Sequence, residues 1–157
     1  EKITKIIKIF STTCAAVAVQ PIPFADIFVL TPIQALMGTR IAAIRGVSVS
    51  EEKASKIITE IASVVGMGLM AQQAVIGAYK VGLPGLGGFM TIPLVYGLTY
   101  AIGKVMDTYF IKKKRNQNFN PEELKKNFNE IMKQKKKEGK KIRKEIWKSK
   151  DDYKIDP

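Results

Sequence analysis

QPIPFADIFVLTPIQ, residues 20–34, is an apolar stretch that contains three prolines and a single carboxylate, Asp26. Before it, residues 2–19 place isoleucines and a phenylalanine at helical spacing, with lysines on the opposite side. Pro21 and Pro23 end this helix because proline lacks a backbone donor and restricts the residue before it. The stretch is therefore predicted to join two helices, and Asp26 to cap a helical turn or to accept backbone N–H bonds in that bend.

A second helix is predicted to begin inside the same stretch, at the sequence TPIQ. Thr31 at the N-cap, Pro32 at the first helical position and Gln34 at the third match a capping box. This helix runs to Gly46, a residue type that often follows the last turn of a helix. Residues 26–30 form either an earlier helical turn or an extended segment.

A second hairpin is predicted to follow the first. Ser48 or Ser50 caps a helix whose first turn holds two glutamates, and this helix continues to about Lys80. The turn of the hairpin is VGLPGLGG, residues 81–88, in which glycine and proline end the helical pattern.

The return helix of this second hairpin is expected to begin at Thr91 or Ile92 and to end near Lys114. Proline 93 is tolerated there because it falls in the first turn. One carboxylate of this helix, Asp107, lies three residues after Lys104 and is predicted to pair with it on one helix face.

The end of the chain is strongly basic. Residues 1–111 carry nine Lys/Arg and six Asp/Glu, whereas residues 112–157 carry seventeen and eight. A fifth helix is predicted from Pro121, capped by Asn120, to about Lys150. Its apolar residues follow nearly heptad spacing, which a lysine interrupts: Leu124, Phe128, Ile131, Ile142 and Ile146. Such a helix fits an anionic membrane surface, an acidic partner, a short coiled coil or a solvated extension of the bundle.

Together these patterns predict an all-α protein. Two helical hairpins form a four-helix bundle-like module, and a basic amphipathic C-terminal helix follows it. The predicted division is an apolar helical-hairpin module over residues 1–115 and a basic helical C-terminal extension over residues 116–157.

Several classes of chemistry find no suitable residues in this chain. It has one cysteine, Cys14, and no histidine, which excludes an internal disulfide, histidine-based catalysis and clustered thiol or imidazole metal sites. The glycine-rich sequence GLPGLGGFM lacks the lysine and the hydroxyl residue of a P-loop. The carboxylates of the apolar part stand one per segment, without acid–base pairing. We therefore expect no enzymatic activity, no cofactor and no metal.

The segment between Glu60 and Lys104 carries one formal charge, Lys80. Its two neutral runs, residues 61–79 and 81–103, are long enough for membrane-spanning helices. Cationic residues gather at the predicted bundle end opposite the two turns, as in hairpins whose turns point away from a positive cytoplasmic side. Against spanning, the first two helices have short uncharged runs, and LPGLGG would expose backbone polar groups to lipid. Two alternatives stay open: contact with a membrane, or the dry core of a soluble bundle.

The sequences AAVAVQPIPFADIFVLTPIQALM, LPGLGG and YAIGKVMDTYF, together with Gly46, resemble a bacterial domain-of-unknown-function family of the DUF697 type. That family occurs C-terminal to Era-like GTPase domains and in YcjF-type inner-membrane proteins. The resemblance covers roughly residues 10–111 and implies an all-helical module that associates with a GTPase or a membrane and has no established activity of its own. No GTP-binding motif precedes the module here, so a GTPase would act in cis in a longer chain or in trans.

The leading hypothesis is a non-enzymatic module on the cytoplasmic face of, or within, the inner membrane, which couples a small GTPase to that membrane or to a self-assembled scaffold. The alternatives are a soluble cytoplasmic module that forms homo-oligomers through the same hairpins, and a pore-forming or membrane-remodelling assembly. Anionic lipids and a GTPase are the expected partners. Nucleic acid is not expected, because the basic segment has few aromatic residues and no nucleic-acid motif.

Two sets of residues are candidate contacts. The predicted hairpin tips supply Pro21, Pro23, Phe24, Asp26, Thr31, Pro32, Gln34, Pro84, Gly85 and Gly87. The basic segment supplies contacts to a membrane surface or an acidic partner: Lys112, Lys113, Lys114, Arg115 and Trp147.

Overall fold

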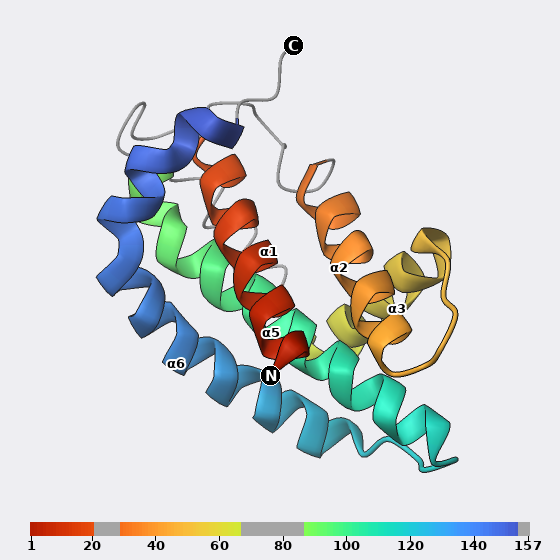
Figure 1. Ribbon diagram of the computed structural model, residues 1–157. Coiled ribbons are helices and arrows are strands. Elements are labelled where there is room, and N and C mark those ends of the chain that lie inside the picture. Colours follow the sequence, from red (N-terminus) through yellow and green to blue (C-terminus); the bar gives the residue numbers. More distant parts are fainter. Residues whose placement is uncertain (21–28, 67–86, 154–157) are drawn as a thin grey trace.

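The computed structural model describes residues 1–20, 29–66 and 87–153 (Figure 1). These residues form five α-helices and one 3-10 helix: α1 (Lys2–Ala18), α2 (Thr31–Ile44), α3 (Glu51–Val65), α5 (Gly87–Lys114), α6 (Pro121–Lys148) and η2 (Ser149–Tyr153). No strand occurs within these ranges. The predicted all-α class is confirmed, and the helices pack as a bundle.

Helix α5 is the central helix of the bundle, and it contacts α1, α2, α3 and α6. Most residues from Gly87 to Phe110 are buried, including Tyr96 and Phe110, which have no exposed surface. Figure 1 shows α1 and α2 side by side across α5, while α6 runs back along α5 in the opposite direction. A helix covered on several sides needs apolar residues all round, which is the composition that α5 has.

Helix α5 begins at Gly87, four residues before the predicted start, so Pro93 lies inside the helix and not in its first turn. The interior proline loses one backbone hydrogen bond. Close packing offsets this loss, because a side chain at Gly88 would come within 2.6 Å of the carbonyl oxygen of Val19. Packing of the neighbouring α1 therefore extends the helix across a residue that usually ends one.

Helix α3 ends at Val65, where Gly66 adopts a φ of 78°. The prediction of one helix continuing to about Lys80 was therefore wrong, and the neutral run of residues 61–79 is not a single helix. Glycine reaches this left-handed conformation without steric cost, which makes it a frequent C-terminal residue of helices. Residues 67–80 lie outside the described part of the chain.

Local signals at the other helix ends have mixed outcomes. Ser50 accepts a hydrogen bond from the backbone N–H of Lys53, and Gly46 follows α2 with a φ of 73°, as predicted. The capping box at Thr31 was wrong. The N-cap of α2 is Leu30, whose side chain has no group that can accept a cap bond, and a π-helical turn at residues 29–30 leads into the helix.

Helix α6 confirms the predicted fifth helix. Asn120 caps it by accepting hydrogen bonds from the backbone N–H groups of Glu122 and Glu123. Its apolar side packs along α5 and contributes Leu124 and Phe128 to the same core as the other helices. The basic helix is therefore bound along the bundle over its length, rather than standing free of it.

Candidate functional site

Five exposed lysines form one side of α6, and we name this surface the lysine face: Lys133, Lys137, Lys140, Lys144 and Lys148. Their spacings of four, three, four and four residues keep them on one side of the helix. The face extends over about 22 Å at 1.5 Å per residue. By the same spacing rule, the two carboxylates of this segment, Glu138 and Glu145, point away from the face. The lysine face is thus a row of cations without an acid among them.

Two glycines hold α6 close to α5. A Cβ at Gly97 would lie 2.9 Å from the backbone nitrogen of Lys136 and 3.0 Å from the carbonyl oxygen of Met132. A Cβ at Gly139 would lie 2.9 Å from the Cα of Pro93. Each glycine therefore faces backbone of the opposite helix, and any side chain there would push the two helices apart.

A polar network fixes the rotation of α6 on α5. The hydroxyl of Tyr96 donates to Oε1 of Glu138 over 2.9 Å, and Nζ of Lys135 donates to Oε2 of the same carboxylate over 2.5 Å. The Lys135 ammonium also lies 4.3 Å from the centre of the Tyr100 ring. Lys135, which interrupts the predicted apolar stripe, is thus an anchor on α5 and not a break in the contact.

Protonation states follow from this network. Burial raises the pKa of Glu138, but the bonds from Lys135 and Tyr96 and the charges of Lys135 and Lys8 outweigh it and hold the pKa below its ordinary value. Burial, followed by the bond to Glu138, raises the pKa of Tyr96, so its hydroxyl keeps the proton that it donates. The network therefore holds a carboxylate and a phenol in fixed roles at neutral pH.

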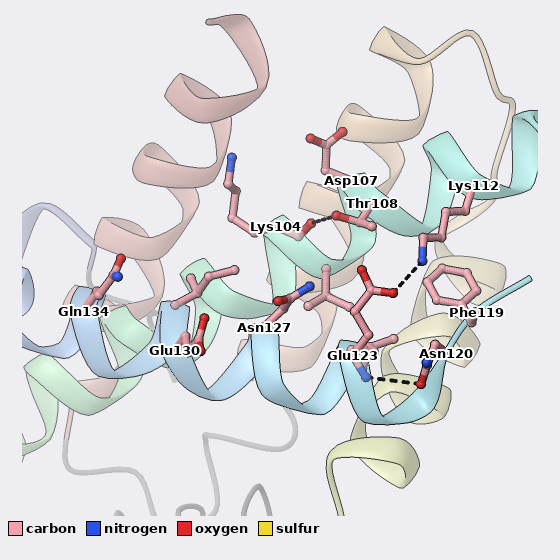
Figure 2. Close-up of a pocket in the computed structure, with 13 residues that line it drawn as sticks. Lys104, Asp107, Thr108, Lys112, Phe119, Asn120, Glu123, Asn127, Glu130 and Gln134 are labelled. Atoms are coloured by element: carbon pink, nitrogen blue, oxygen red, sulfur yellow. Dashed lines mark hydrogen bonds and ion pairs between the residues drawn. The ribbon is translucent and has the colours of Figure 1, made fainter. Parts of the chain in front are cut away.

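A groove of about 200 Å³, lined by both polar and apolar residues, lies between the second half of α5 and the first half of α6 (Figure 2). Lys112 and Glu123 close one end through an ion pair of 3.3 Å, as Figure 2 shows. Asp107 lines the groove, but Arg45 already binds its carboxylate. Groups of both signs line the walls, and the described residues include no cluster of three acidic, cysteine or histidine side chains that could hold a metal ion. The groove therefore does not select a ligand by charge.

Asp107 pairs with Arg45 of α2, which corrects the predicted pairing with Lys104. Nε of Arg45 donates to Oδ1 over 2.6 Å, and Nη2 donates to Oδ2 over 3.0 Å. Two charge-assisted bonds to one carboxylate make this one of the stronger forms of an Arg–carboxylate pair. The pair joins the end of α2 to α5 across 62 residues of sequence.

The predicted hairpin-tip residues fall partly in the described chain. Thr31 and Pro32 begin α2, and Pro32 is exposed. Gln34 is buried and donates to the hydroxyl of Thr99 over 3.1 Å, so it joins α2 to α5 and does not cap a helix. Gly87 is buried at the start of α5. The remaining predicted tip residues lie outside the described residues: Pro21, Pro23, Phe24, Asp26, Pro84 and Gly85.

The predicted basic contacts do not form one surface. Lys112, Lys113, Lys114 and Arg115 lie at the C-terminal end of α5, whereas Trp147 lies near the end of α6. Because the two helices are antiparallel, Trp147 packs edge to face on Phe89 at the other end of α5, with ring centroids 5.4 Å apart.

The basic residues at the end of α5 differ in their contacts. Lys112 pairs with Glu123, the Lys113 ammonium lies 5.8 Å from the centre of the Tyr109 ring, and Lys114 donates to the carbonyl oxygen of Arg45 over 3.1 Å. Arg115 is exposed.

Sequence reasoning did not single out the lysine face, the two close-contact glycines or Arg45. A helical projection of residues 133–148 would have separated the face from the acidic residues. The glycines carry a weaker signal, because a glycine inside a helical pattern costs stability and so suggests a packing reason. No local signal could have identified Arg45, since its partner is distant in sequence.

One described helix, α5, is long and apolar enough to cross a membrane. Within the bundle, however, 83% of the apolar window is buried by the protein itself. Core helices of soluble proteins meet the same criteria, so this helix is weak evidence for membrane association.

The architecture defines a small all-α module in which several helices surround one apolar helix, α5, and a basic helix, α6, packs along it. By comparison with family models, the chain belongs to the family described as "Domain of unknown function (DUF697)", whose model matches residues 1–137. The match includes α1 to α5 and the first part of α6. No curated protein and no solved structure matches the chain.

Proposed function

We propose that this chain is a non-enzymatic module that attaches to the anionic cytoplasmic surface of a membrane through the lysine face. The observation that carries the proposal is a row of five lysines on the exposed side of a helix whose other side is fixed to the core. A rigid helix holds these cations at one level, so several can approach lipid headgroups together. Each lysine close to such a surface contributes about 1 kcal/mol.

The position of the lysine face supports attachment at the surface over a span through α5. Helix α6 runs along α5 from the Lys112–Glu123 pair at one end to the contact of Phe89 with Trp147 at the other. If α5 crossed the hydrocarbon with α6 in place, the lysine face would lie at the same depth. Each lysine there would cost about 2.5–3.5 kcal/mol near the bilayer centre.

A matched pair of triple variants tests the attachment. K137Q/K140Q/K144Q removes three charges from the lysine face, and K2Q/K5Q/K53Q removes three exposed charges from α1 and α3. In co-sedimentation with anionic vesicles, the first variant should bind about 100-fold more weakly than the native chain, since three contributions of about 1 kcal/mol are lost. The second should bind nearly as well as the native chain. Equal losses in both variants would mean that net charge, and not the lysine face, determines binding.

A crosslink between α5 and α6 separates surface attachment from insertion of α5. A Cβ at Gly139 would lie 3.3 Å from the Cβ of Tyr96, close to the roughly 3.5–4.5 Å found in disulfides. The variant Y96C/G139C can therefore be oxidised to link the helices covalently. Its reduced form is the matched control, because it carries the same crowding at Gly139 and the same loss of the Tyr96–Glu138 bond without the crosslink. The native Cys14 should not interfere, because it is buried and its pKa is raised to about 12. Oxidised and reduced protein should bind vesicles equally, whereas binding lost on oxidation would favour insertion.

Coupling to a GTPase is the second part of the proposal. Its support is the resemblance of the proline turn, the glycine turn and the end of α5 to a family that accompanies GTPase domains. The module would bring such a domain, in the same chain or in a partner, to the membrane surface or to a scaffold. Vesicle recruitment of an Era-like GTPase from the same cell, with GDP and with a GTP analogue, tests this coupling. Recruitment that does not depend on the module in either nucleotide state would remove it from the proposal.

A homo-oligomeric module is the second candidate function, and the outer side of α2 favours it. Leu36 and Ile44 there are 36% and 43% exposed, beside the exposed Pro32 and Ala43, and Arg40 is the charged residue between them. An apolar helix side is commonly covered by another protein surface. Sedimentation equilibrium without detergent should then give a defined oligomer that L36S dissociates. A monomer at high concentration would eliminate this candidate.

A further inference from the structure

A hollow at the end of the bundle combines positive charge with apolar surface. Its volume is about 530 Å³, and we name it the basic corner, defined by its lining residues: Ile44, Arg45, Ile111, Lys114 and Arg115. The residues come from the ends of α2 and α5 and the chain directly after them, which lie together because Lys114 donates to the carbonyl oxygen of Arg45. No carboxylate is among the residues that line the hollow.

The cations of the basic corner keep donors free for a ligand. Arg45 uses Nε and Nη2 for Asp107, which holds its guanidinium in one orientation and leaves further N–H donors. Lys114 uses one of its three N–H groups for the Arg45 carbonyl. Arg115 is exposed and forms no ion pair with a described residue. Several donors of one charge in one hollow favour an anion with several acceptor oxygens, and phosphate is such a group.

Two isoleucines give the basic corner an apolar part. Ile44 is 43% exposed beside the cations, and Ile111, which also lines the hollow, is half-buried. Leu36, two helical turns away on the exposed side of α2, is a further exposed apolar residue, with the exposed Arg40 between it and Ile44. A free phosphate ion would leave these residues exposed to water. A phosphate that is joined to a hydrocarbon part would cover them.

We propose that the basic corner binds the phosphate headgroup of an anionic phospholipid, with its glycerol and acyl part against Ile44 and Ile111. A phosphate monoester fits best, because it presents three oxygens and close to two charges to Arg45, Lys114 and Arg115. The inference rests on the proposed membrane attachment for the source of its ligand. The basic corner is nevertheless a separate surface, since it lies at the opposite end of the α5–α6 pair from Trp147 and the end of the lysine face (Figure 1).

Vesicles that contain phosphatidic acid, a monoester, test this site against vesicles that contain phosphatidylglycerol, a diester, at matched surface potential. The native chain should prefer phosphatidic acid by about tenfold, the worth of one good charge-assisted hydrogen bond. K114Q/R115Q should abolish the preference. The charge-matched variant K140Q/K144Q, on the lysine face, should weaken binding to both vesicles and keep the preference.

Controls make each outcome decisive. R115Q alone should reduce the preference without loss of fold, because its side chain makes no ion pair with a described residue, whereas K114Q also removes the bond to Arg45. Glycerol 3-phosphate is the soluble probe. If it binds the corner and displaces the protein from neither vesicle, the ligand is a soluble phosphate and the lipid assignment is overturned. A native chain that binds both vesicles equally overturns the basic corner alone, and one that binds neither overturns membrane attachment as well.

Discussion

Replacing Gly97 by alanine should weaken the contact between α5 and α6, whereas the same change at Gly38 of α2 should not destabilise the bundle. A Cβ at Gly97 would meet fixed backbone, the nitrogen of Lys136 at 2.9 Å and the carbonyl oxygen of Met132 at 3.0 Å. A Cβ at Gly38 would mainly meet the terminal methyl of Met106, which ends a flexible side chain. The two substitutions are the same in chemistry and differ in whether the obstacle can move.

The magnitude follows from two opposing terms. Each substitution gains about 1 kcal/mol of helix propensity when glycine becomes alanine. Overpacking against backbone at Gly97 costs about 1–3 kcal/mol, so G97A should lose up to about 2 kcal/mol of unfolding free energy. A change in the torsion angles of the Met106 side chain moves its terminal methyl and sulfur away and keeps the cost at Gly38 small, so G38A should be neutral or stabilising. Because the propensity gain is common to both variants, the expected difference between them is about 1–3 kcal/mol.

Urea unfolding measures this difference by circular dichroism and by the fluorescence of Trp147, the single tryptophan. Because Trp147 packs on Phe89 of α5, its emission reports release of the end of α6. A midpoint for G97A at or above that of G38A would refute the reasoning, since it would mean that the close approach of the two helices contributes nothing to stability.

Two further predictions concern charged groups. R45Q should destabilise the bundle by about 1–3 kcal/mol because it leaves the Asp107 carboxylate without its partner, and R45Q/D107N should recover part of that loss. Thermal melts of the native chain, of R45Q, of D107N and of the double variant complete a double-mutant cycle that measures the coupling. The pKa of Glu138 is lowered in the folded state, so its contribution to stability is present above its ordinary pKa and is lost as the pH falls through the lowered value. The native chain should therefore exceed E138Q in melting temperature at pH 7, and this advantage should shrink below about pH 4.5; an advantage that is constant across the pH series would contradict the assigned ion pair.

Features that depend on neighbouring residues could be predicted from the sequence. The caps at Ser50 and Asn120 and the helix end at Gly46 each depend on a few adjacent residues, and all three are present. The apolar side of α6 was also predictable, because helical spacing alone places Leu124 and Phe128 on one side. Gly66 carried the same kind of signal as Gly46, but the long neutral run around it suggested a continuous helix.

Features that depend on distant residues could not be predicted in this way. The bond from Gln34 to Thr99 spans 65 residues, and a local capping box was the simpler interpretation of the TPIQ sequence. The start of α5 before Pro93 likewise depends on packing against α1, which overrides the local preference of proline. Each of these predictions failed because a tertiary contact outweighed a local propensity.

The helices around α5 account for its apolar composition. Hydropathy measures only how poorly a segment interacts with water, and both lipid and protein can supply the apolar surroundings that such a segment needs. In this bundle α1, α2, α3 and α6 supply them, and α6 presents its lysine face outward alongside the same helix. Exposing α5 to lipid would require α6 to leave, which would uncover Phe128 and Ile146 and break the Tyr96–Glu138 bond. The basic helix that carries the proposed membrane contact therefore also covers α5, and both observations support the proposal of attachment at the surface over a span through α5.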